Sequence, residues 1–340
     1  MINLDEAEIR MASHETQDQS EQILSNDAYI QYAVMMKNTV KHWHRIFCEA
    51  GDIWQPAVFL APATLLLFVF AYWPLLQDVW LSFHLWNMIS PAMKFVGLQN
   101  YFQLFTSAEL VKIITNTVLY IVVLLLINFL LPYLLSFMMA HLLKRFSFFY
   151  RSALFAPSTV SLAVASILFL WIFNPLAGPL SILLSAVGLE SPRWFKEPVL
   201  VVIVIGMIIG WKVFGYNLIL LLSAMVDVPR ELIEAARIEN ASDWQLFRYI
   251  IVPMTSSTAL YVFVITIVFG LQYVLVPVNM LTQGGPDQGS TNLVYIVYQY
   301  GFVFFQTGKA AAFAILSMLI YAFFLMLKTK VLDKKVHYEN

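Results

Sequence analysis

Long apolar stretches, each bounded by polar or charged residues, dominate the chain from residue 57 onward. A helix needs about 20 mostly apolar residues to cross the hydrocarbon core of a bilayer. Six stretches reach that length: 57–82, 110–143, 151–173, 198–224, 254–282 and 310–330. The pattern therefore predicts an all-α, polytopic membrane protein with six transmembrane helices. Prolines inside several stretches, among them Pro132, Pro157 and Pro277, predict kinked helices that pack as a bundle.

The composition supports this interpretation and excludes other classes of protein. Of the 340 residues, 60% are apolar and 12% are charged, whereas about 25% of residues are charged in soluble domains. Mean hydropathy is +0.73, and the formal net charge of -1 gives no global positive field for nucleic acid. We therefore exclude a soluble globular enzyme, a disordered protein and a nucleic-acid binder.

The first 50 residues differ from the rest of the chain. They are polar and rather acidic as far as Asp27 and then turn basic at Lys37, Lys41 and Arg45. This stretch has no short apolar core followed by a small-residue cleavage site, so we do not expect a cleaved signal peptide. We predict a cytosolic N-terminal tail over residues 1–50 and a transmembrane domain over residues 51–340.

Basic residues are unevenly distributed between the two ends of the predicted spans. Thirteen lie near one side: Lys37, Lys41, Arg45, Lys144, Arg145, Arg151, Arg230, Arg237, Arg248, Lys328, Lys330, Lys334 and Lys335. Five lie near the other: Lys94, Lys112, Arg193, Lys196 and Lys309. Short loops rich in Lys and Arg stay in the cytosol. The asymmetry predicts that both termini are cytosolic, as an even number of spans requires.

One polar insertion, residues 225–253, interrupts the apolar pattern and predicts two short helices. Pro229 suits the first turn of the first helix, which should end near Asn240, because asparagine tolerates a left-handed backbone. Ser242 and Gln245 have the spacing of a capping box that begins the second helix. From these residues alone, the loop is either an amphipathic segment lying on the membrane or a rigid knob presented to a cytosolic partner.

The same loop resembles part of a known family. Glu234-Ala235-Ala236, followed by Ala241, Phe247, Ile250 and Pro253, resembles the EAA loop of ATP-binding-cassette (ABC) importer permeases. Glu239 and Asn240 stand where the family has Asp-Gly, and Asn240 keeps the left-handed turn accessible. Further similar segments follow in the family's order: 95–101, 171–174, 211–217 and the Gly284-Gly285-Pro286 turn. The resemblance runs from about residue 55 to the C-terminus and is closest to the carbohydrate branch, which includes maltose-type and glycerol-3-phosphate-type permeases.

The resemblance implies a type I ABC importer permease fold with a cytosolic coupling helix, in a bacterial inner membrane. The chain would form half of the translocation pathway for a sugar or sugar-like solute, beside a second homologous permease subunit. Two copies of an ABC ATPase would supply energy, and an extracytoplasmic solute-binding protein would deliver the solute. The ATPase-coupling residues would be Glu234, Ala235, Ala236, Asn240, Ala241, Phe247 and Pro253. ATP and Mg would bind to the ATPase subunits, so we expect no cofactor on this chain.

Polar residues within the spans are costly and are therefore candidate functional residues. As candidates for a substrate pathway we select Lys212, Tyr216, Asn217, Gln272, Tyr273 and Asn279. The alternative for the amides is hydrogen bonding between helices, which we favour for Asn116 and Asn128. Lys212 either snorkels, pairs with a carboxylate or meets an anionic solute.

The sequence gives no sign of catalysis or of a metal site. Cys48 is the only cysteine, and the six histidines form no metal-ligand cluster. Gly308-Lys309 lacks the first glycine and the Ser or Thr of a phosphate-binding P-loop. Two competing functions are weaker. An ion-coupled secondary transporter or channel acting alone needs intramembrane carboxylates, of which Asp78 is the main one, and a membrane-embedded enzyme needs a catalytic residue set.

Overall fold

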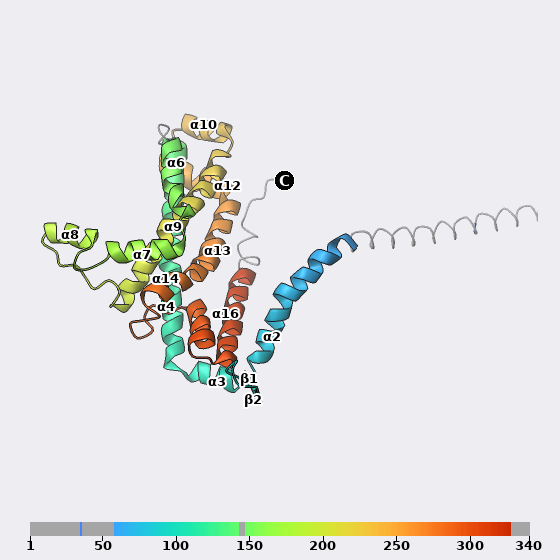
Figure 1. Cartoon of the computed structure of the whole chain (residues 1–340). Helices are drawn as coiled ribbons and strands as arrows, with labels where there is room; N and C mark the ends of the chain where they lie inside the picture. Colours follow the sequence, from blue (N-terminus) through green and yellow to red (C-terminus); the bar gives the residue numbers. More distant parts are fainter. Residues whose placement is uncertain (1–34, 36–57, 143–146, 328–340) are drawn as a thin grey trace, which may run out of the picture. The chain divides into compact units, whose positions relative to one another are not determined.

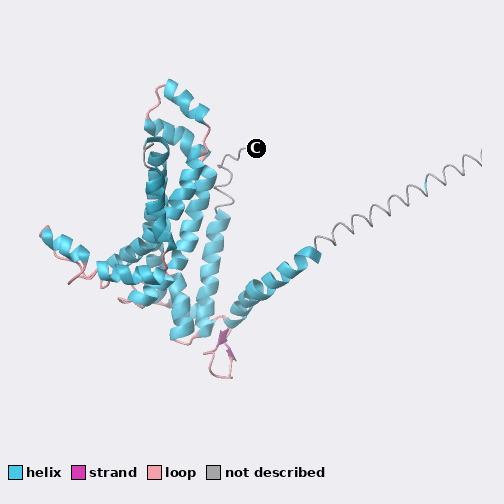
Figure 2. Cartoon of the chain, turned by 45° about the horizontal axis from the view of Figure 1, so that its top comes forward, coloured by secondary structure: helices cyan, strands magenta, loops and turns pink. Residues whose placement is uncertain are grey.

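A computed structural model describes Met35, residues 58–142 and residues 147–327. The predicted tail over residues 1–50 lies outside the described residues except for Met35, as do the basic residues from Lys328 onward. The chain divides into two compact units, Met1–Leu75 and Leu76–Asn340. The described residues are mostly helical, and their only strands form a small hairpin (Figure 2). In it β1 (His84–Leu85) pairs antiparallel with β2 (Lys94–Phe95), His84 opposite Phe95.

The first predicted span is one helix, Val58–Leu81, which ends as α2 (Trp73–Leu81) after a π-helical turn at Phe68–Tyr72. Within the first compact unit, every residue from 58 to 75 is exposed. A helix that is apolar on all sides and exposed within its own unit is suited to contact lipid or other membrane-embedded helices.

In the second unit, the second predicted span is a rod of 34 residues, Ala108–His141. The short helix α3 (Gln99–Thr106) precedes it. The rod comprises α4 (Ala108–Leu125) and α5 (Leu131–Phe137), with π-helical turns at Leu126–Leu130 and Met138–Leu142. The rod begins at Ser107, whose hydroxyl accepts a hydrogen bond from the Leu110 amide, with Glu109 at the positive end of the helix dipole.

Helix α9 (Pro198–Val226) is the centre of the bundle and confirms the fourth predicted span (Figure 1). It packs against α4, α5, α7 and α13. Its first half carries fully buried aliphatic side chains, including Val201, Ile205 and Ile208, that join the main core cluster with Tyr120 and Leu271. Because α9 is apolar on every side, it can be surrounded by the other helices.

The third predicted span, residues 151–173, is wrong as a single helix. Helix α6 (Ser147–Phe155) runs into a 3₁₀ turn (Ala156–Thr159), and α7 (Leu162–Ile172) leaves it at 105°. Pro157 cannot continue the hydrogen-bond ladder, and the extended residue Ser161 caps α7 by accepting from the Val164 amide. Helix α8 (Pro179–Ala186) follows at the end of this arm (Figure 1).

The fifth predicted span contains α13 (Ser256–Tyr273) and α14 (Leu275–Leu281). The loop that follows folds back into the bundle, where Ser290, Thr291 and Asn292 are fully buried. Polar side chains of α4 hold this loop: Asn116 Nδ2 donates to the carbonyl of Gln288 at 2.7 Å, and the Tyr120 hydroxyl donates to the carbonyl of Ser290 at 2.9 Å. Asn116 thus bonds within the bundle, although its partners lie in a loop and not, as the sequence had led us to expect, in another helix.

The chain ends its described part with α15 (Leu293–Tyr298), a π-helical turn (Gln299–Val303) and α16 (Thr307–Leu327). Among the described residues, four helices are long and apolar enough to cross a membrane, or five if the bent α6–α7 pair counts as one span. The expectation of six spans is thus supported only in its coarser form, a polytopic helical membrane protein.

Candidate functional site

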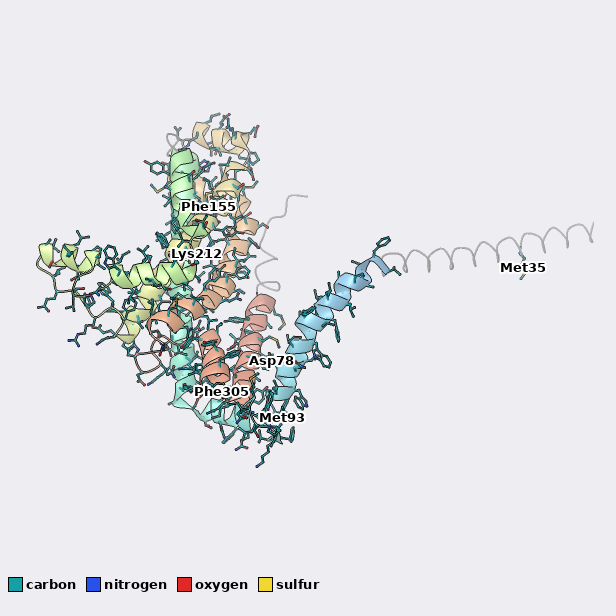
Figure 3. All side chains as sticks on the ribbon, viewed as in Figure 1. Met35, Asp78, Met93, Phe155, Lys212 and Phe305 are labelled. Carbon is teal, nitrogen blue, oxygen red and sulfur yellow. The ribbon has the colours of Figure 1, made fainter. Side chains whose placement is uncertain are left out.

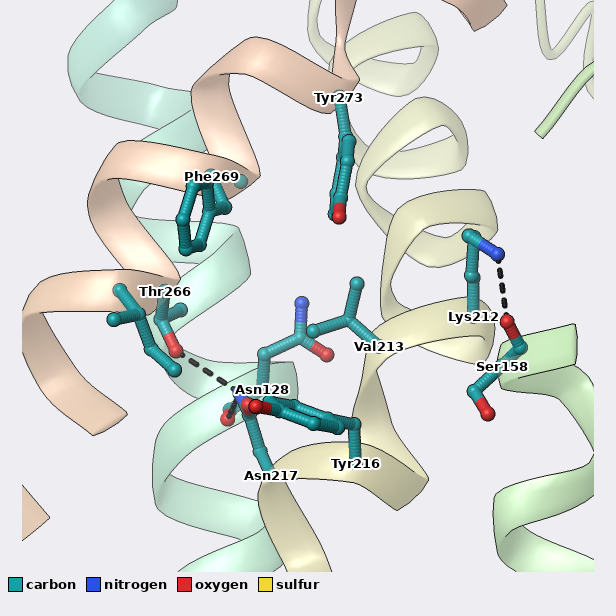
Figure 4. A pocket seen from close by; sticks show the side chains of 11 residues that line it. Asn128, Ser158, Lys212, Val213, Tyr216, Asn217, Thr266, Phe269 and Tyr273 are labelled. Atoms are coloured by element: carbon teal, nitrogen blue, oxygen red, sulfur yellow. Dashed lines mark hydrogen bonds between the residues drawn. The ribbon is translucent and has the colours of Figure 1, made fainter. Parts of the chain in front are cut away.

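A cavity of about 320 Å³ lies within the bundle, between the rod, the α6–α7 break, α9 and α13 (Figure 4). Nine of its eleven lining residues come from two helices: Lys212, Val213, Tyr216 and Asn217 from α9, and Ile265, Thr266, Phe269, Gly270 and Tyr273 from α13. Asn128 of the rod and Ser158 of the break complete the wall. Four predicted pathway residues therefore meet here: Lys212, Tyr216, Asn217 and Tyr273.

Lys212 is bound to backbone rather than to a carboxylate. Its Nζ donates to the carbonyl of Ser158 at 2.8 Å and to the carbonyl of Val160 at 2.5 Å. The 3₁₀ turn and the extended Val160 place these carbonyls outside the regular helical ladder. The ammonium of Lys212 thus links the α6–α7 break to α9 (Figure 3).

Loss of this ammonium should destabilise the bundle. In Lys212→Met, the carbonyls of Ser158 and Val160 lose their donor, and an unpaired, partly buried polar group costs about 1–3 kcal/mol. We expect a lower midpoint of thermal unfolding for the purified protein in detergent. Lys196→Met, the same change at an exposed residue, is the control. Equal midpoints for Lys212→Met and the wild type would show that the two hydrogen bonds contribute nothing.

Asn217 cross-links three helices. It is 1% exposed, and its Nδ2 donates to the backbone carbonyl of Asn128 at 2.6 Å and to Thr266 Oγ1 at 3.0 Å. Its amide nitrogen is therefore committed to the bundle, although the residue lines the cavity. Its role here is to hold α9, α13 and the rod in register around the site.

Sequence reasoning missed six of the eleven lining residues, three of them polar or aromatic, and misjudged Asn128. Ser158, Thr266 and Phe269 were not selected, and Asn128 was expected to bond between helices. Instead both polar atoms of the Asn128 side chain are buried without a hydrogen-bond partner in the described part of the chain. A usable signal was present on α13, because Thr266, Phe269 and Tyr273 recur at i, i+3 and i+7 on one helical face.

Gln272 and Asn279 lie outside the cavity, and both side chains are exposed. Gln272 directly precedes Tyr273, and adjacent helical residues point in directions about 100° apart. The assignment of Gln272 and Asn279 to a substrate pathway stays a prediction, and it would now concern a surface of the bundle and not this cavity. Among the described residues, no three His, Cys, Asp or Glu side chains are close enough to hold a metal ion.

The loop over residues 225–253 folds as the sequence predicted, as two short helical segments. Helix α10 (Arg230–Ile238) ends in a Schellman motif: the Ala241 amide donates to the Ala236 carbonyl, and Asn240 has a φ of 56°. Helix α11 (Asp243–Leu246) begins with the complete Ser242–Gln245 capping box and continues through a π-helical turn (Phe247–Ile251) to α12 (Val252–Met254).

The loop is fixed to the bundle on one side and open on the other. Leu246, Phe247 and Ile251 are buried against Tyr133 and Met225. On α10, Ala236 packs partly against this cluster. Glu234 and Ala235, by contrast, are exposed, as is Asn240, while Ala241 and Pro253 are half-buried. The predicted coupling residues thus divide into an exposed helix surface and the buried support that orients it.

The left-handed residue at the end of α10 yields a local prediction. Asn240→Val puts a β-branched residue at a φ of 56°, which costs about 1–2 kcal/mol, while Asn240→Gly removes the strain altogether. We expect the valine variant to expose Arg237 to trypsin about 5–30-fold faster than the wild type. The glycine variant should be cleaved at the wild-type rate or more slowly. Identical cleavage of both variants would contradict the Schellman geometry.

The comparisons with known proteins agree with this architecture. Residues 132–338 match the family described as "Binding-protein-dependent transport system inner membrane component". The chain belongs to this family. It is therefore an inner-membrane permease component of an ABC transport system, and the resemblance found in the sequence is confirmed.

Relatives of this permease cover most of its length. It is 32% identical over 268 residues to a probable ABC transporter permease, YurN, of Bacillus subtilis, covering 78% of this chain and 91% of that protein. It is 29% identical to the sn-glycerol-3-phosphate transport system permease protein UgpA of Agrobacterium fabrum, covering 83% of this permease and 96% of the relative.

Two solved structures share the fold of this permease. One is a bacterial ABC transporter involved in the import of the acidic polysaccharide alginate, with a TM-score of 0.70 and 20% identity over 84% of this chain and 97% of the other. The second is a bacterial alginate ABC transporter in complex with its alginate pentasaccharide-bound periplasmic protein, with a TM-score of 0.69, again at 20% identity, covering 84% and 98%. At this identity the likeness shows the fold.

Proposed function

We propose that this permease subunit forms half of the pathway of an ATP-driven importer for a sugar or sugar-like solute, and that loop 225–253 couples it to the ATPase. One observation carries the proposal. The loop joins the end of α9 to the start of α13, and those two helices supply nine of the eleven residues that line the cavity. A movement of the loop therefore acts directly on the helices around the solute.

The exposed surface of α10 is suited to dock on a protein. Glu234 and Ala235 face solvent on a short, capped helix whose opposite side rests on the buried cluster around Phe247. The small side chain of Ala235 allows a close approach, and Glu234 offers a charge to a partner. We assign this surface to docking on an ABC ATPase. The importer would contain two copies of the ATPase, each docked on the coupling helix of one permease subunit. ATP and Mg would bind to the ATPases, and we expect no cofactor on this chain.

The wall of the cavity fits a sugar-like solute. Aromatic residues Tyr216, Phe269 and Tyr273 stand beside amide and hydroxyl groups (Figure 4), the mixture of apolar faces and a few polar groups found in small-molecule sites. One relative is named for transport of glycerol-3-phosphate, and one structure of the same fold is of a transporter that imports alginate. Both names support a polyhydroxylated solute.

The proposal includes two further protein partners and an orientation of the chain in the membrane. A second homologous permease subunit would cover exposed surface of the helical bundle, including Gln272 and Asn279. An extracytoplasmic binding protein would deliver the solute, as the family description implies. The thirteen-to-five distribution of basic residues supports cytosolic termini.

Six crossings remain our proposal for the topology. Helix α16 has 21 residues and is about 30 Å long at 1.5 Å per residue, enough to cross the hydrocarbon core. The bent α6–α7 pair would form the third crossing. Lys212 satisfies the carbonyls of Ser158 and Val160 at the break, and broken helices are tolerated at membrane depth where neighbouring helices satisfy the freed backbone groups.

The proposed function is tested by ATP hydrolysis in the purified complex, prepared with its ATPase, second permease and binding protein. We expect addition of the sugar-loaded binding protein to raise the rate of ATP hydrolysis several-fold, and Phe269→Ala or Tyr273→Ala to reduce that stimulation. Stimulation that is unchanged in both cavity variants would separate the cavity from the transport pathway.

A further inference from the structure

Asn128 stands out among the residues that line the cavity. It is 1% exposed, and neither its Nδ2 nor its Oδ1 has a hydrogen-bond partner among the described residues. Of the eleven lining residues, it alone has buried side-chain polar atoms in this condition. A buried, unpaired polar group costs about 1–3 kcal/mol, so this carboxamide needs a partner that enters the cavity.

The lysine and the second amide of the wall already have partners within the chain. The ammonium of Lys212 is directed at the carbonyls of Ser158 and Val160. The Asn217 amide nitrogen is used by Thr266 and by the backbone of Asn128. No carboxylate lines the cavity. The hydrogen-bonding groups that stay available in the wall are therefore uncharged: the buried Asn128 carboxamide and the hydroxyls of Ser158, Tyr216 and Tyr273.

The backbone around Asn128 holds its side chain in place before any solute binds. Asn128 lies in the π-helical turn Leu126–Leu130, and such turns are frequent at functional sites. Its backbone carbonyl is held by Asn217 at 2.6 Å, and its side chain projects among the rings of Tyr216, Phe269 and Tyr273 (Figure 4). The match to the family begins at residue 132, so the family match itself does not describe Asn128.

We propose that Asn128 is the residue that recognises the solute, by a paired hydrogen bond to two adjacent hydroxyl groups of an uncharged sugar ring. The proposal rests on the proposed function and adds the charge class of the solute. A carboxamide presents a donor and an acceptor side by side, which matches one hydroxyl that accepts and a neighbouring hydroxyl that donates. The three aromatic rings cover the apolar faces of the sugar. A cavity of about 320 Å³ is at the small end of ligand sites and suits one or two rings.

Direct binding to the purified complex tests this assignment. The probes are labelled glucose and maltose as neutral sugars, and glucuronate and glycerol-3-phosphate as anions, measured at equilibrium without the binding protein. We expect a neutral sugar to bind best, and Asn128→Leu to lower its affinity at least tenfold. Asn128→Asp, which keeps the shape but removes the amide donors, should lower it similarly. Gln103→Leu, at an exposed residue of α3, should bind as the wild type.

Thermal unfolding of the same variants separates recognition from a structural role. Because the Asn128 side chain has no partner in the described structure, Asn128→Leu should unfold at or above the wild-type temperature. A lower unfolding temperature with unchanged sugar affinity would assign Asn128 to the bundle and overturn the proposal. So would preferential binding of an anionic probe through Lys212, or a wild-type complex that binds none of the neutral sugars. In each of these cases the proposed function stands if ATP hydrolysis still responds to the loaded binding protein.

Discussion

Glu234→Lys is expected to uncouple the permease from its ATPase while leaving the bundle folded. Glu234 is exposed on α10 and makes none of the contacts that hold the loop, since the buried support comes from Leu246, Phe247 and Ile251. Reversing a charge at the centre of a docking surface costs about 2 kcal/mol or more, which corresponds to roughly 30-fold weaker association. We expect the ATPase to be lost during affinity purification of the variant permease, and solute uptake to fall to background.

The matched control for this experiment is Glu190→Lys. Glu190 is exposed like Glu234 but lies in the segment between α8 and α9, on the side with few basic residues. The control should retain ATPase and transport, and both variants should unfold at the wild-type temperature. Normal co-purification and uptake by Glu234→Lys would remove loop 225–253 from the coupling pathway, whatever the effect of the control.

Gly215→Ala is expected to destabilise the bundle strongly. A Cβ atom at residue 215 would collide with the carbonyl oxygen of Leu154 and lie 2.7 Å from the Cα of Phe155, both of them backbone atoms of α6. Backbone cannot yield as a side-chain tip does, so α6 must move away from α9. Overpacking of this kind costs about 1–3 kcal/mol, and a loss of 3 kcal/mol lowers the unfolding temperature by about 10 °C.

Two further results distinguish a local collision from a general effect of removing glycine. Gly301→Ala is the matched control, because its Cβ would meet only the Ala310 methyl at an ordinary 3.6 Å. We also expect Gly215→Ala and Lys212→Met to be non-additive, since moving α6 already separates the Ser158 carbonyl from Lys212. A Gly215→Ala protein as stable as the Gly301→Ala protein would contradict the close packing of α6 on α9.

The sequence predicted the parts of the fold that depend on local rules. The positions of the long rod and of α9 follow from apolar length alone, and the end of α10 at Asn240 and the capping box at Ser242 follow from local hydrogen bonding. The failure at residues 151–173 has a physical cause. Pro157 shows where a helical hydrogen bond is lost. The 105° turn also depends on Ser161, which caps α7, and on Lys212, an ammonium far away in sequence that donates to the Ser158 carbonyl.

The candidate site was predicted less completely, because its helices are apolar on nearly every side. Such a helix does not indicate which of its polar residues faces the interior, so Gln272 and its neighbour Tyr273 were selected together although only Tyr273 lines the cavity. Asn128 was misjudged for a related reason. Whether a buried amide finds a partner depends on side chains far away in sequence, and here Asn217 bonds to the Asn128 backbone and leaves its side chain unpaired.

The energy source for solute uptake tests the central claim most directly. The purified complex, with its second permease, ATPase and binding protein, would be placed in sealed vesicles, and accumulation of labelled mono- and disaccharides would be followed. The account predicts accumulation only with ATP on the ATPase side and binding protein on the other, and none in the Glu234→Lys complex. Accumulation driven by a proton or sodium gradient without ATP would contradict it and would instead establish an ion-coupled transporter.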